Sequence, residues 1–300
     1  MRPARLTAGD TVALVAPSGP VPCDLLDAAV PVLRGWGLKV WIGAAVRADD
    51  GPTYLSAPDE MRAAEFTEAW LDPEVRCVLA ARGGYGAQRM VDLVDWRALR
   101  AAGPKVLAGS SDVTALHRAV HTHLGLATVF SPMPASVLFD ADAAEHLRRT
   151  LFDPDHTRVL RAREPDVLVP GRALGVLVGG NLSLLAAGIG TAEQGSARGG
   201  IVLLEDVTES PYRIDRMVTQ LLRSGWFAGV RGIVLGSWAA CGDEAAIRAL
   251  LRERLSPLGV PVLGGFGFGH VAGSPTLPLG VSASLDTELG TLTLDSPALD

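Results

Sequence analysis

Three residues of this 300-residue chain have the types and settings that acyl transfer requires: Ser111, Glu205 and His270. Ser111 follows a short apolar run that ends in glycine, and it precedes Asp112 and a helix-like stretch. A strand that turns sharply into a helix exposes one side chain at the turn, beside the unpaired N–H groups of the helix start. This setting suits a nucleophile whose oxyanion needs hydrogen-bond donors. It also suits a helix cap, because Ser and Asp are favoured there, and both interpretations stand at this point.

Glu205 and His270 also end apolar segments. Glu205 follows the run 200–204, which reads as a buried strand, and His270 follows the glycine-rich stretch 264–269. Open α/β sheets bind their ligands at the ends of strands. Glu205 has the alternative role of capping the next turn, and His270 that of a structural histidine with a satisfied ring. A serine, a carboxylate and a histidine at three such ends supply the nucleophile, the orienting group and the base of a hydrolase.

Two further clusters invite other chemistry. His117, His121 and His123 include an i, i+4 pair on one helix face, but the glutamate of H-E-x-x-H and a nearby third ligand are lacking. We therefore expect no metal and no cofactor. The stretch R-G-G-Y-G at 82–86 matches neither common phosphate-binding pattern. We expect its bare backbone N–H groups to face an oxyanion at the tip of the following strand.

The composition excludes several classes of protein. A hydrophobic fraction of 48% and a charged fraction of 20% are typical of a globular fold. The net charge of −6, without any basic block, argues against a nucleic-acid partner. Three widely separated cysteines indicate neither a disulfide framework nor a zinc ribbon. No apolar stretch is long enough to span a membrane or to form the core of a secretory leader. We therefore expect a cytoplasmic protein with no membrane partner.

Alternating strand and helix patterns predict the fold. Apolar runs at 11–16, 39–46, 75–81, 106–109 and 126–130 alternate with helical periodicities at 22–36, 58–72 and 87–99. Such alternation favours a mostly parallel sheet flanked by helices, as in α/β proteins. After a charged, proline-containing stretch, a second half follows with strands near 175, 200, 232 and 261 and an alternating tail at 276–295.

We therefore predict an α/β protein with two domains. Residues 1–135 form an N-terminal α/β domain that carries the nucleophile, residues 136–172 a linker with a helix near 141–151, and residues 173–300 a C-terminal domain that carries the Glu and the His. The linker is inferred from its charge, its prolines and its weak periodicity. Because neither half holds both a nucleophile and its base, the predicted site lies between the two.

Six motifs occur in order along nearly the whole chain and resemble those of the LD-carboxypeptidase family of serine peptidases, which also contains the microcin C immunity hydrolases. They are R-G-G-Y-G-A-Q-R (82–89), V-D-W (94–96), P-K-V-L-A-G-S-S-D-V-T-A-L (104–116), G-V-L-V-G-G-N-L (175–182), L-E-D-V-T-E-S-P-Y-R-I-D-R-M (204–217) and F-G-H-V with T-L-P-L-G (268–280). One departure is Ser110, where the family usually has an aromatic residue. The departure concerns the lining of this side of the pocket and not the nucleophile.

The resemblance implies roles for particular residues. It assigns the nucleophile to Ser111, the orienting carboxylate to Glu205 and the base to His270, with oxyanion donors at the N–H groups of Asp112 and Gly84. It also implies a β-rich, mixed α/β second domain, a homodimer and a small peptide substrate. That substrate would be a murein tetrapeptide, cut between the L-centre of a diamino acid and terminal D-alanine during cell-wall recycling.

A carboxypeptidase must also bind a free carboxylate, which arginine does through two parallel hydrogen bonds. Arg82 and Arg213 are the candidates, although each can equally be a surface or structural arginine. Two rival functions remain. One is an immunity-type hydrolase of aminoacyl-nucleotide conjugates, which needs an aromatic residue to stack on a base, and 134–172 offers only Phe139 and Phe152. The other is a murein-peptide-binding protein without catalysis. The G-x-S-x-G motif of α/β-hydrolases is absent, because Val113 stands where glycine is needed.

Overall fold

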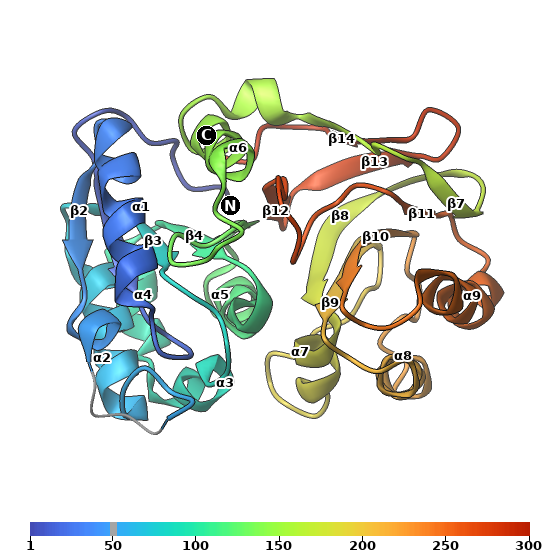
Figure 1. The fold of residues 1–300 in the computed structure, drawn as a ribbon, viewed down its shortest axis with the longest axis horizontal. Coiled ribbons are helices and arrows are strands. Elements are labelled where there is room, and N and C mark those ends of the chain that lie inside the picture. The colour runs from blue at the N-terminus through green and yellow to red at the C-terminus, as the bar shows by residue number, and fades with distance from the viewer. Residues whose placement is uncertain (49–52) are drawn as a thin grey trace.

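The computed structural model describes residues 1–48 and 53–300, and it places two sheets side by side with helices around them (Figure 1). The first sheet has the strand order β12-β5-β4-β3-β1-β2. Neighbours among β1 to β5 are parallel, and β12 is antiparallel to β5. Its strands are β1 (Thr11–Val15), β2 (Lys39–Ile42), β3 (Val75–Ala80), β4 (Val106–Gly109), β5 (Thr128–Phe130) and β12 (Leu277–Leu279).

The strands of the first sheet are apolar at almost every position because both faces of the sheet are covered. Val12 and Leu14 of β1 belong to one buried cluster, whereas Ala13 and Val15 belong to the cluster on the opposite face. Side chains alternate across a strand, so a continuous apolar run serves two cores. The covering helices are α1 (Cys23–Gly35), α2 (Asp59–Leu71), α3 (Ala87–Met90), α4 (Trp96–Ala102), α5 (Thr114–Leu124) and α6 (Ala141–Phe152).

The second sheet has the order β6-β14-β13-β8-β9-β10-β11-β7 and mixes both strand directions. Its central strands β8 to β11 are parallel, and antiparallel strands flank them on both sides. The strands are β6 (Val159–Arg161), β7 (Asp166–Val169), β8 (Arg172–Asn181), β9 (Gly200–Val207), β10 (Gly232–Ala239), β11 (Val262–Gly264), β13 (Ser282–Asp286) and β14 (Thr291–Leu294). The helices are α7 (Leu182–Ala187), α8 (Pro211–Arg223) and α9 (Glu244–Leu255). The predicted fold class, a mostly parallel α/β sheet followed by a β-rich mixed part, is confirmed.

Local differences from the predicted elements have local causes. The helix predicted over 87–99 is divided into α3, a 3₁₀ turn (Val91–Leu93) and α4. Asp95 causes the division, because its Oδ1 accepts hydrogen bonds from Arg97 N at 3.1 Å and Ala98 N at 3.0 Å and so starts a new helix. Further 3₁₀ turns lie at Ala44–Arg47, Ser111–Val113, Pro154–Thr157 and Ser256–Leu258.

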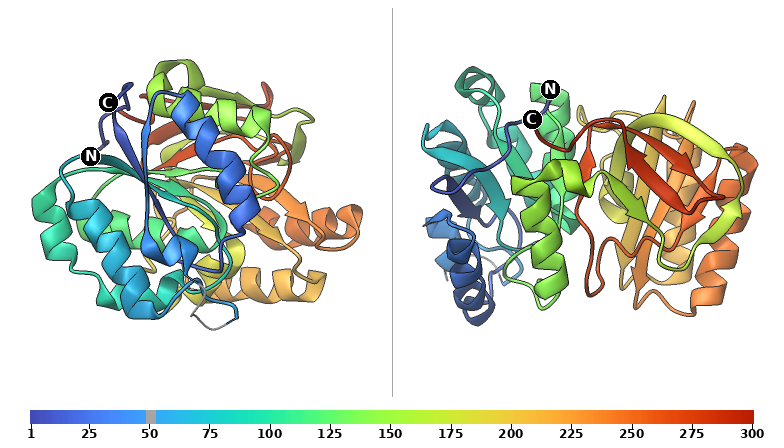
Figure 2. Two further views of the ribbon diagram at one scale, coloured as in Figure 1. Left: turned by 60° about the vertical axis from the view of Figure 1, so that its left-hand side comes forward. Right: turned by 90° about the horizontal axis from the view of Figure 1, so that it is seen from above.

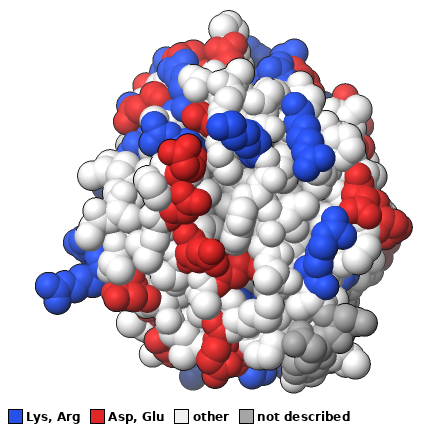
Figure 3. Space-filling view, turned by 90° about the vertical axis from the view of Figure 1, so that its left-hand side faces the viewer, with Lys and Arg blue, Asp and Glu red and all other residues white. Residues whose placement is uncertain are grey.

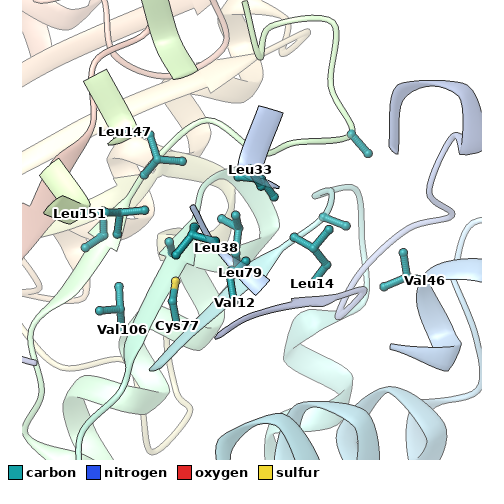
Figure 4. Packing of buried hydrophobic residues seen from close by; sticks show 14 of the residues in the cluster. Val12, Leu14, Leu33, Leu38, Val46, Cys77, Leu79, Val106, Leu147 and Leu151 are labelled. Atoms are coloured by element: carbon teal, nitrogen blue, oxygen red, sulfur yellow. The ribbon is translucent and has the colours of Figure 1, made fainter. Parts of the chain in front are cut away.

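The chain crosses between the two sheets more than once. Helix α6, which the sequence places in the linker, packs Leu147 and Leu151 into the same buried cluster as Val12 and Leu14 of the first sheet (Figure 4). Strands β6 and β7 from the same stretch form the two edges of the second sheet. Strand β12, from the C-terminal part, pairs with β5 of the first sheet. The view from above shows α6 lying between the two halves (Figure 2). The division at 135 and 172 stays a prediction.

One face of the molecule, on the side of α2 and α4, carries a band of acidic side chains with basic ones toward its edges (Figure 3).

None of the helices within 1–48 and 53–300 combines the length and the apolar character that a membrane crossing needs.

Candidate active site

Ser111 lies at the sharp turn that follows β4. Gly109 ends the strand, Ser110 is extended, and Ser111 has a φ of 59°, which is left-handed. A residue with a side chain is strained there, and such strain persists where the surrounding structure holds it. A 3₁₀ turn and α5 follow at once, so the predicted strand–turn–helix arrangement is present.

The helix-cap interpretation of Ser111 gains no support from its contacts. The residues that precede the 3₁₀ turn and α5, Ser110 and Val113, form no side-chain cap. The Ser111 hydroxyl makes no hydrogen bond with any residue that the structure describes. The Ser111 side chain is half-buried, and its hydroxyl is not held by a cap hydrogen bond.

The glycine-rich loop 82–86 lies directly against the serine turn. A Cβ on Gly83 would stand 3.0 Å from Ser111 Cβ and 3.3 Å from its Oγ, so a side chain here would crowd the serine. The carbonyl of Gly83 accepts a hydrogen bond from Gly19 N at 3.0 Å. The N–H of Gly84 belongs to the same trans peptide and therefore points away from Gly19. Of the two predicted oxyanion donors, Asp112 directly follows Ser111 in the chain, and Gly84 follows Gly83, the loop residue that approaches Ser111.

Asp112 has a function in the structure that the sequence did not reveal. Its carboxylate is buried and accepts a hydrogen bond from Ala87 N at 2.8 Å, at the start of α3. Burial raises the pKa of Asp112, and the hydrogen bond from Ala87 opposes that rise. Buried Arg62 donates from Nη1 to Gly86 O at 2.9 Å in the same loop. These contacts fix the glycine loop relative to the serine turn.

Glu205 and His270 come together although 65 residues separate them. Glu205 is completely buried in β9, and its Oε2 lies 2.7 Å from His270 Nδ1. The backbone N–H of His270 donates to Ser237 Oγ at 2.8 Å, which fixes the start of the loop. Gly269 has a φ of 107°, and a side chain at this position would strike Glu205 and Ser237. The glycine before the histidine is therefore required by the approach of the carboxylate.

The environment of His270 favours a proton on the ring. Burial alone would lower the pKa of His270, because it penalises the charged imidazolium. The hydrogen bond and the negative charge of Glu205, together with the charge of Asp206, outweigh burial and raise the pKa of His270 above its ordinary value. Since Nδ1 faces the carboxylate, Nε2 is the ring nitrogen left for a reacting group.

Asn181 is the site residue that sequence reasoning missed. Its Nδ2 donates to Glu205 Oε1 at 3.1 Å and to Asp206 Oδ1 at 3.0 Å, and its own N–H donates to Thr114 Oγ1 at 3.1 Å. Thr114 is the first residue of α5, three positions after Ser111. Asn181 therefore joins the serine helix to the glutamate that orients the histidine. The one signal in the sequence was the strand ending in Gly179-Gly180-Asn181.

A strand pairing and an aromatic contact connect the segments that carry Ser111 and His270. Gly109 lies opposite Phe130 in the first sheet, and the Phe130 ring meets Phe268 edge-on with ring centroids 6.2 Å apart. Ser111 and His270 each follow two residues later along their segments. No hydrogen bond joins Ser111 Oγ to His270 within the described part of the chain. Catalytic hydrogen bonds are commonly long before substrate binds.

The two candidate carboxylate-binding arginines are exposed and already have partners. Arg82 begins the glycine loop, and its Nη1 donates to Pro20 O at 2.5 Å. Arg213 lies in the first turn of α8, where its Nη1 is 3.6 Å from Glu209 Oε2 and its Nε donates to Tyr212 Oη at 3.3 Å. Neither arginine contacts Ser111, Glu205 or His270 through a hydrogen bond between described residues.

The histidines of α5 are engaged in protein contacts. His117 is buried, with Nε2 2.9 Å from Gly109 O, and burial lowers its pKa to about 4. His123 stacks on Trp96 with ring centroids 4.8 Å apart, and its Nε2 lies 2.8 Å from Glu193 Oε1. Across 1–48 and 53–300, no three His, Cys, Asp or Glu residues are grouped to hold a metal ion.

A mostly parallel and a mixed α/β sheet that carry a serine turn, a glycine loop and a carboxylate–histidine pair define a protein of the hydrolase type. Comparison with known proteins makes this specific. Residues 12–131 match the N-terminal domain of LD-carboxypeptidases, and residues 174–285 match their C-terminal domain. The chain belongs to the LD-carboxypeptidase family and is a peptidase.

Individual relatives and solved structures are similar to this chain over nearly its whole length. A Streptomyces coelicolor protein named for a carboxypeptidase activity is 56% identical over 303 residues, covering 100% of this chain and 97% of that protein. The crystal structure of muramoyltetrapeptide carboxypeptidase from Oxalobacter formigenes has a TM-score of 0.81 and 31% identity, covering 96% of this chain and 99% of that one. The structure of MccF in complex with glutamyl sulfamoyl guanosine has a TM-score of 0.88 at 23% identity, covering 100% and 99%, and it shows a shared fold.

Proposed function

We propose that this protein is a serine LD-carboxypeptidase in which Ser111, His270 and Glu205 form a catalytic triad. The observation that carries the proposal is the 2.7 Å contact between His270 Nδ1 and buried Glu205, and the left-handed turn that holds Ser111 supports it. His270 Nε2 takes the Ser111 proton as Oγ attacks the scissile carbonyl, and it then gives that proton to the leaving amine. Glu205 holds the ring in the correct tautomer and stabilises the imidazolium.

The tetrahedral intermediate carries a negative oxygen that needs donors already in place. We assign this function to the backbone N–H groups of Gly84 and Asp112. The approach of Gly83 to Ser111 and the orientation of the Gly83–Gly84 peptide support the first assignment. The position of Asp112 in the first turn after Ser111, where N–H groups lack helical partners, supports the second.

The substrate that we propose is a murein tetrapeptide, cut between the L-centre of its diamino acid and terminal D-alanine in cell-wall recycling. The named activity of the Oxalobacter relative supports this class of substrate. Arg82 and Arg213 remain the candidates for binding the terminal carboxylate, and both guanidinium groups reach solvent. A cytoplasmic location stays an expectation from the composition, and a homodimer stays one from the family resemblance.

The fold shared with MccF supports one alternative, an immunity-type hydrolase of aminoacyl-nucleotide conjugates. Such an enzyme needs an aromatic face for the base. Phe139 and Phe152, the aromatics of 134–172, pack against the core of the first sheet, which favours the peptide substrate. A peptide-binding protein without catalysis is the second alternative, and hydrolysis of any LD-peptide would exclude it.

The decisive experiment incubates the purified protein with a murein tetrapeptide, its C-terminal amide, its L-alanine diastereomer and an aminoacyl-nucleotide conjugate, and identifies the products by mass. We expect release of D-alanine from the free acid alone. Arg82→Gln and Arg213→Gln are compared with Arg223→Gln, which changes an exposed arginine at the end of α8. Replacing the arginine that binds the terminal carboxylate of the substrate should raise KM for the tetrapeptide. The control replacement should leave KM unchanged.

Contrary outcomes are equally clear. Equal cleavage of the amide would indicate an endopeptidase or amidase, because no terminal carboxylate would then be recognised. Cleavage of the conjugate alone would establish the immunity-type alternative. Binding of the tetrapeptide without any product would establish the non-catalytic one.

A further inference from the structure

A separate cavity of about 270 Å³ lies between the helices that follow the catalytic loops. It is bordered by α3 after the glycine loop, by α5 after the serine turn, and by α7 with the segment that follows it. Its lining consists of Gln88, Val91, Asp92, Ala115, Arg118, Leu184, Leu185, Gly188, Thr191, Ala192, Glu193 and Gln194. None of these residues belongs to the triad or to the oxyanion donors proposed above.

Arg118 is the cation of this cavity. It extends from α5 to the segment after α7, where its Nε donates to Glu193 O at 3.2 Å and its guanidinium lies against Gly195. Among the described residues, no carboxylate oxygen lies within 4.0 Å of its guanidinium nitrogens. The side chain of Glu193 does not pair with Arg118. Its Oε1 lies 2.8 Å from His123 Nε2 instead.

A guanidinium in this position has unused binding capacity. Arginine carries five N–H donors, and the hydrogen bonds of Arg118 account for one of them. Burial lowers the pKa of Arg118, which means that its positive charge is incompletely compensated. Partly buried charges are normally paired, since an unpaired one loses hydration without gaining a partner. An anionic group that entered the cavity would supply the missing acceptors.

The remaining walls indicate the rest of the ligand. Val91, Leu184, Leu185 and Ala115 give the cavity apolar surfaces, and Gln88 adds an amide. Sites for small organic molecules combine apolar walls with a few placed polar groups in this way. The volume admits a fragment-sized molecule and excludes a peptide chain of several residues. Asp92 also lines the cavity, is exposed, and would disfavour a ligand with more than one negative charge.

We propose that this cavity is a second ligand site, which binds a small organic monocarboxylate with a compact apolar body, its carboxylate paired with Arg118. The site is distinct from the catalytic cleft and does not depend on the proposed reaction. Its walls come from residues 88–118 on one side and 184–194 on the other, so an occupant contacts both halves of the chain. Binding therefore raises the stability of the folded protein against unfolding.

The test compares two probes of equal shape on the unmodified protein. 4-Methylpentanoate carries the carboxylate, and 4-methylpentanamide replaces it by a neutral amide. We expect calorimetry to show affinity for the carboxylate at least about tenfold higher than for the amide, as for a hydrogen bond to a charged group. The carboxylate should raise the thermal unfolding midpoint, and the amide should not. This comparison needs no variant and so cannot fail through misfolding.

Variants then locate the site. Arg118→Gln should abolish the preference for the carboxylate, whereas Arg223→Gln, at an exposed position at the end of α8, should keep it. Ala192→Leu fills the cavity from an exposed segment and should weaken both probes. Ser111→Ala should leave binding unchanged, and a saturating murein tripeptide product should not displace the probe.

Several results would overturn the proposal. Equal affinities of the two probes would remove the need for a cation, and an unchanged preference in Arg118→Gln would place the cation elsewhere. Absence of binding at millimolar carboxylate would leave no site to explain. Displacement by the tripeptide would assign the probe to the catalytic cleft. None of these results bears on whether Ser111 is the nucleophile.

Discussion

Two histidines, one in each half of the molecule, have opposite properties. His117 contacts Gly109 O, at the end of the strand that precedes Ser111, and His270 contacts Glu205, at the end of β9. Both rings are largely removed from water. The pKa of His117 is lowered to about 4 by burial, whereas the pKa of His270 is raised despite burial, because a carboxylate faces it.

The difference shows how one residue type becomes structural or catalytic. A carbonyl partner leaves a buried imidazole neutral at every physiological pH, so His117 can hold the serine turn but cannot exchange protons. A carboxylate partner stabilises the imidazolium that forms when a base accepts a proton. Burial lowers the pKa of both rings, and only the carboxylate beside His270 outweighs it.

The largest expected effect is the loss of the catalytic unit. Ser111→Ala or His270→Ala should each lower turnover of a murein tetrapeptide by roughly three to six orders of magnitude, because a triad acts as a unit. The double variant should be scarcely worse than either single one. Turnover is measured as D-alanine released. Ser110→Ala, one residue away, is the matched control and should keep most of the activity. If the losses of the two single variants multiplied in the double variant, Ser111 and His270 would not act as one catalytic unit.

Glu205→Gln should have a smaller effect, because it misorients the base without removing it. We expect kcat to fall by roughly 10²- to 10⁴-fold. The exposed Glu288→Gln should leave kcat unchanged, since its side chain is 83% accessible. A loss in Glu205→Gln as large as that in Ser111→Ala would show that the carboxylate does more than orient the ring.

The pH dependence sharpens the comparison of the two histidines. His270 acts as a base only when neutral, and its raised pKa means that kcat/KM should fall on acidification with an apparent pKa above the ordinary value of about 6.5. The residual activity of Glu205→Gln should show this acid limb at lower pH, because the neutral amide no longer stabilises the imidazolium. An unmoved limb would assign the titration to another group.

His117 should affect stability and not catalysis. Its pKa of about 4 lies below the unfolded value of about 6.5, so the unfolded chain binds the proton more readily. The contribution of neutral His117 to the free energy of unfolding is complete above pH 6.5. About 3 kcal/mol of this free energy is lost as the pH falls toward 4. Urea unfolding of wild type and His117→Gln at pH 7 and pH 4 measures this difference. His156→Gln, on the surface, serves as the control for the substitution itself.

The smallest expected effect is that of chelation. Exhaustive treatment with a chelator should leave turnover unchanged, because the expected mechanism uses no metal. Activity lost to the chelator and restored by zinc would contradict the serine mechanism.

Much of the fold was predictable because its signals are local. Continuous apolar runs predicted strands covered on both faces, and the glycines after them predicted the turns at which Ser111 and His270 stand. Helix boundaries were less accurate where one side chain decided them, as Asp95 did by starting α4. The family resemblance added the roles of the three triad residues, which spacing alone left open.

The tertiary structure alone decided the connections between these local features. Asn181 reaches both Thr114 and Glu205, and Asp112 reaches Ala87, although 20 or more residues separate each pair. Strand β12 leaves its own half of the chain to pair with β5. Periodicity and turn chemistry extend over a few residues, so they placed each side chain at a strand end. Which strand ends meet depends on long-range packing of both sheets, and only that packing gave His270 its carboxylate, whereas His117 contacts a carbonyl of its own strand–turn–helix segment.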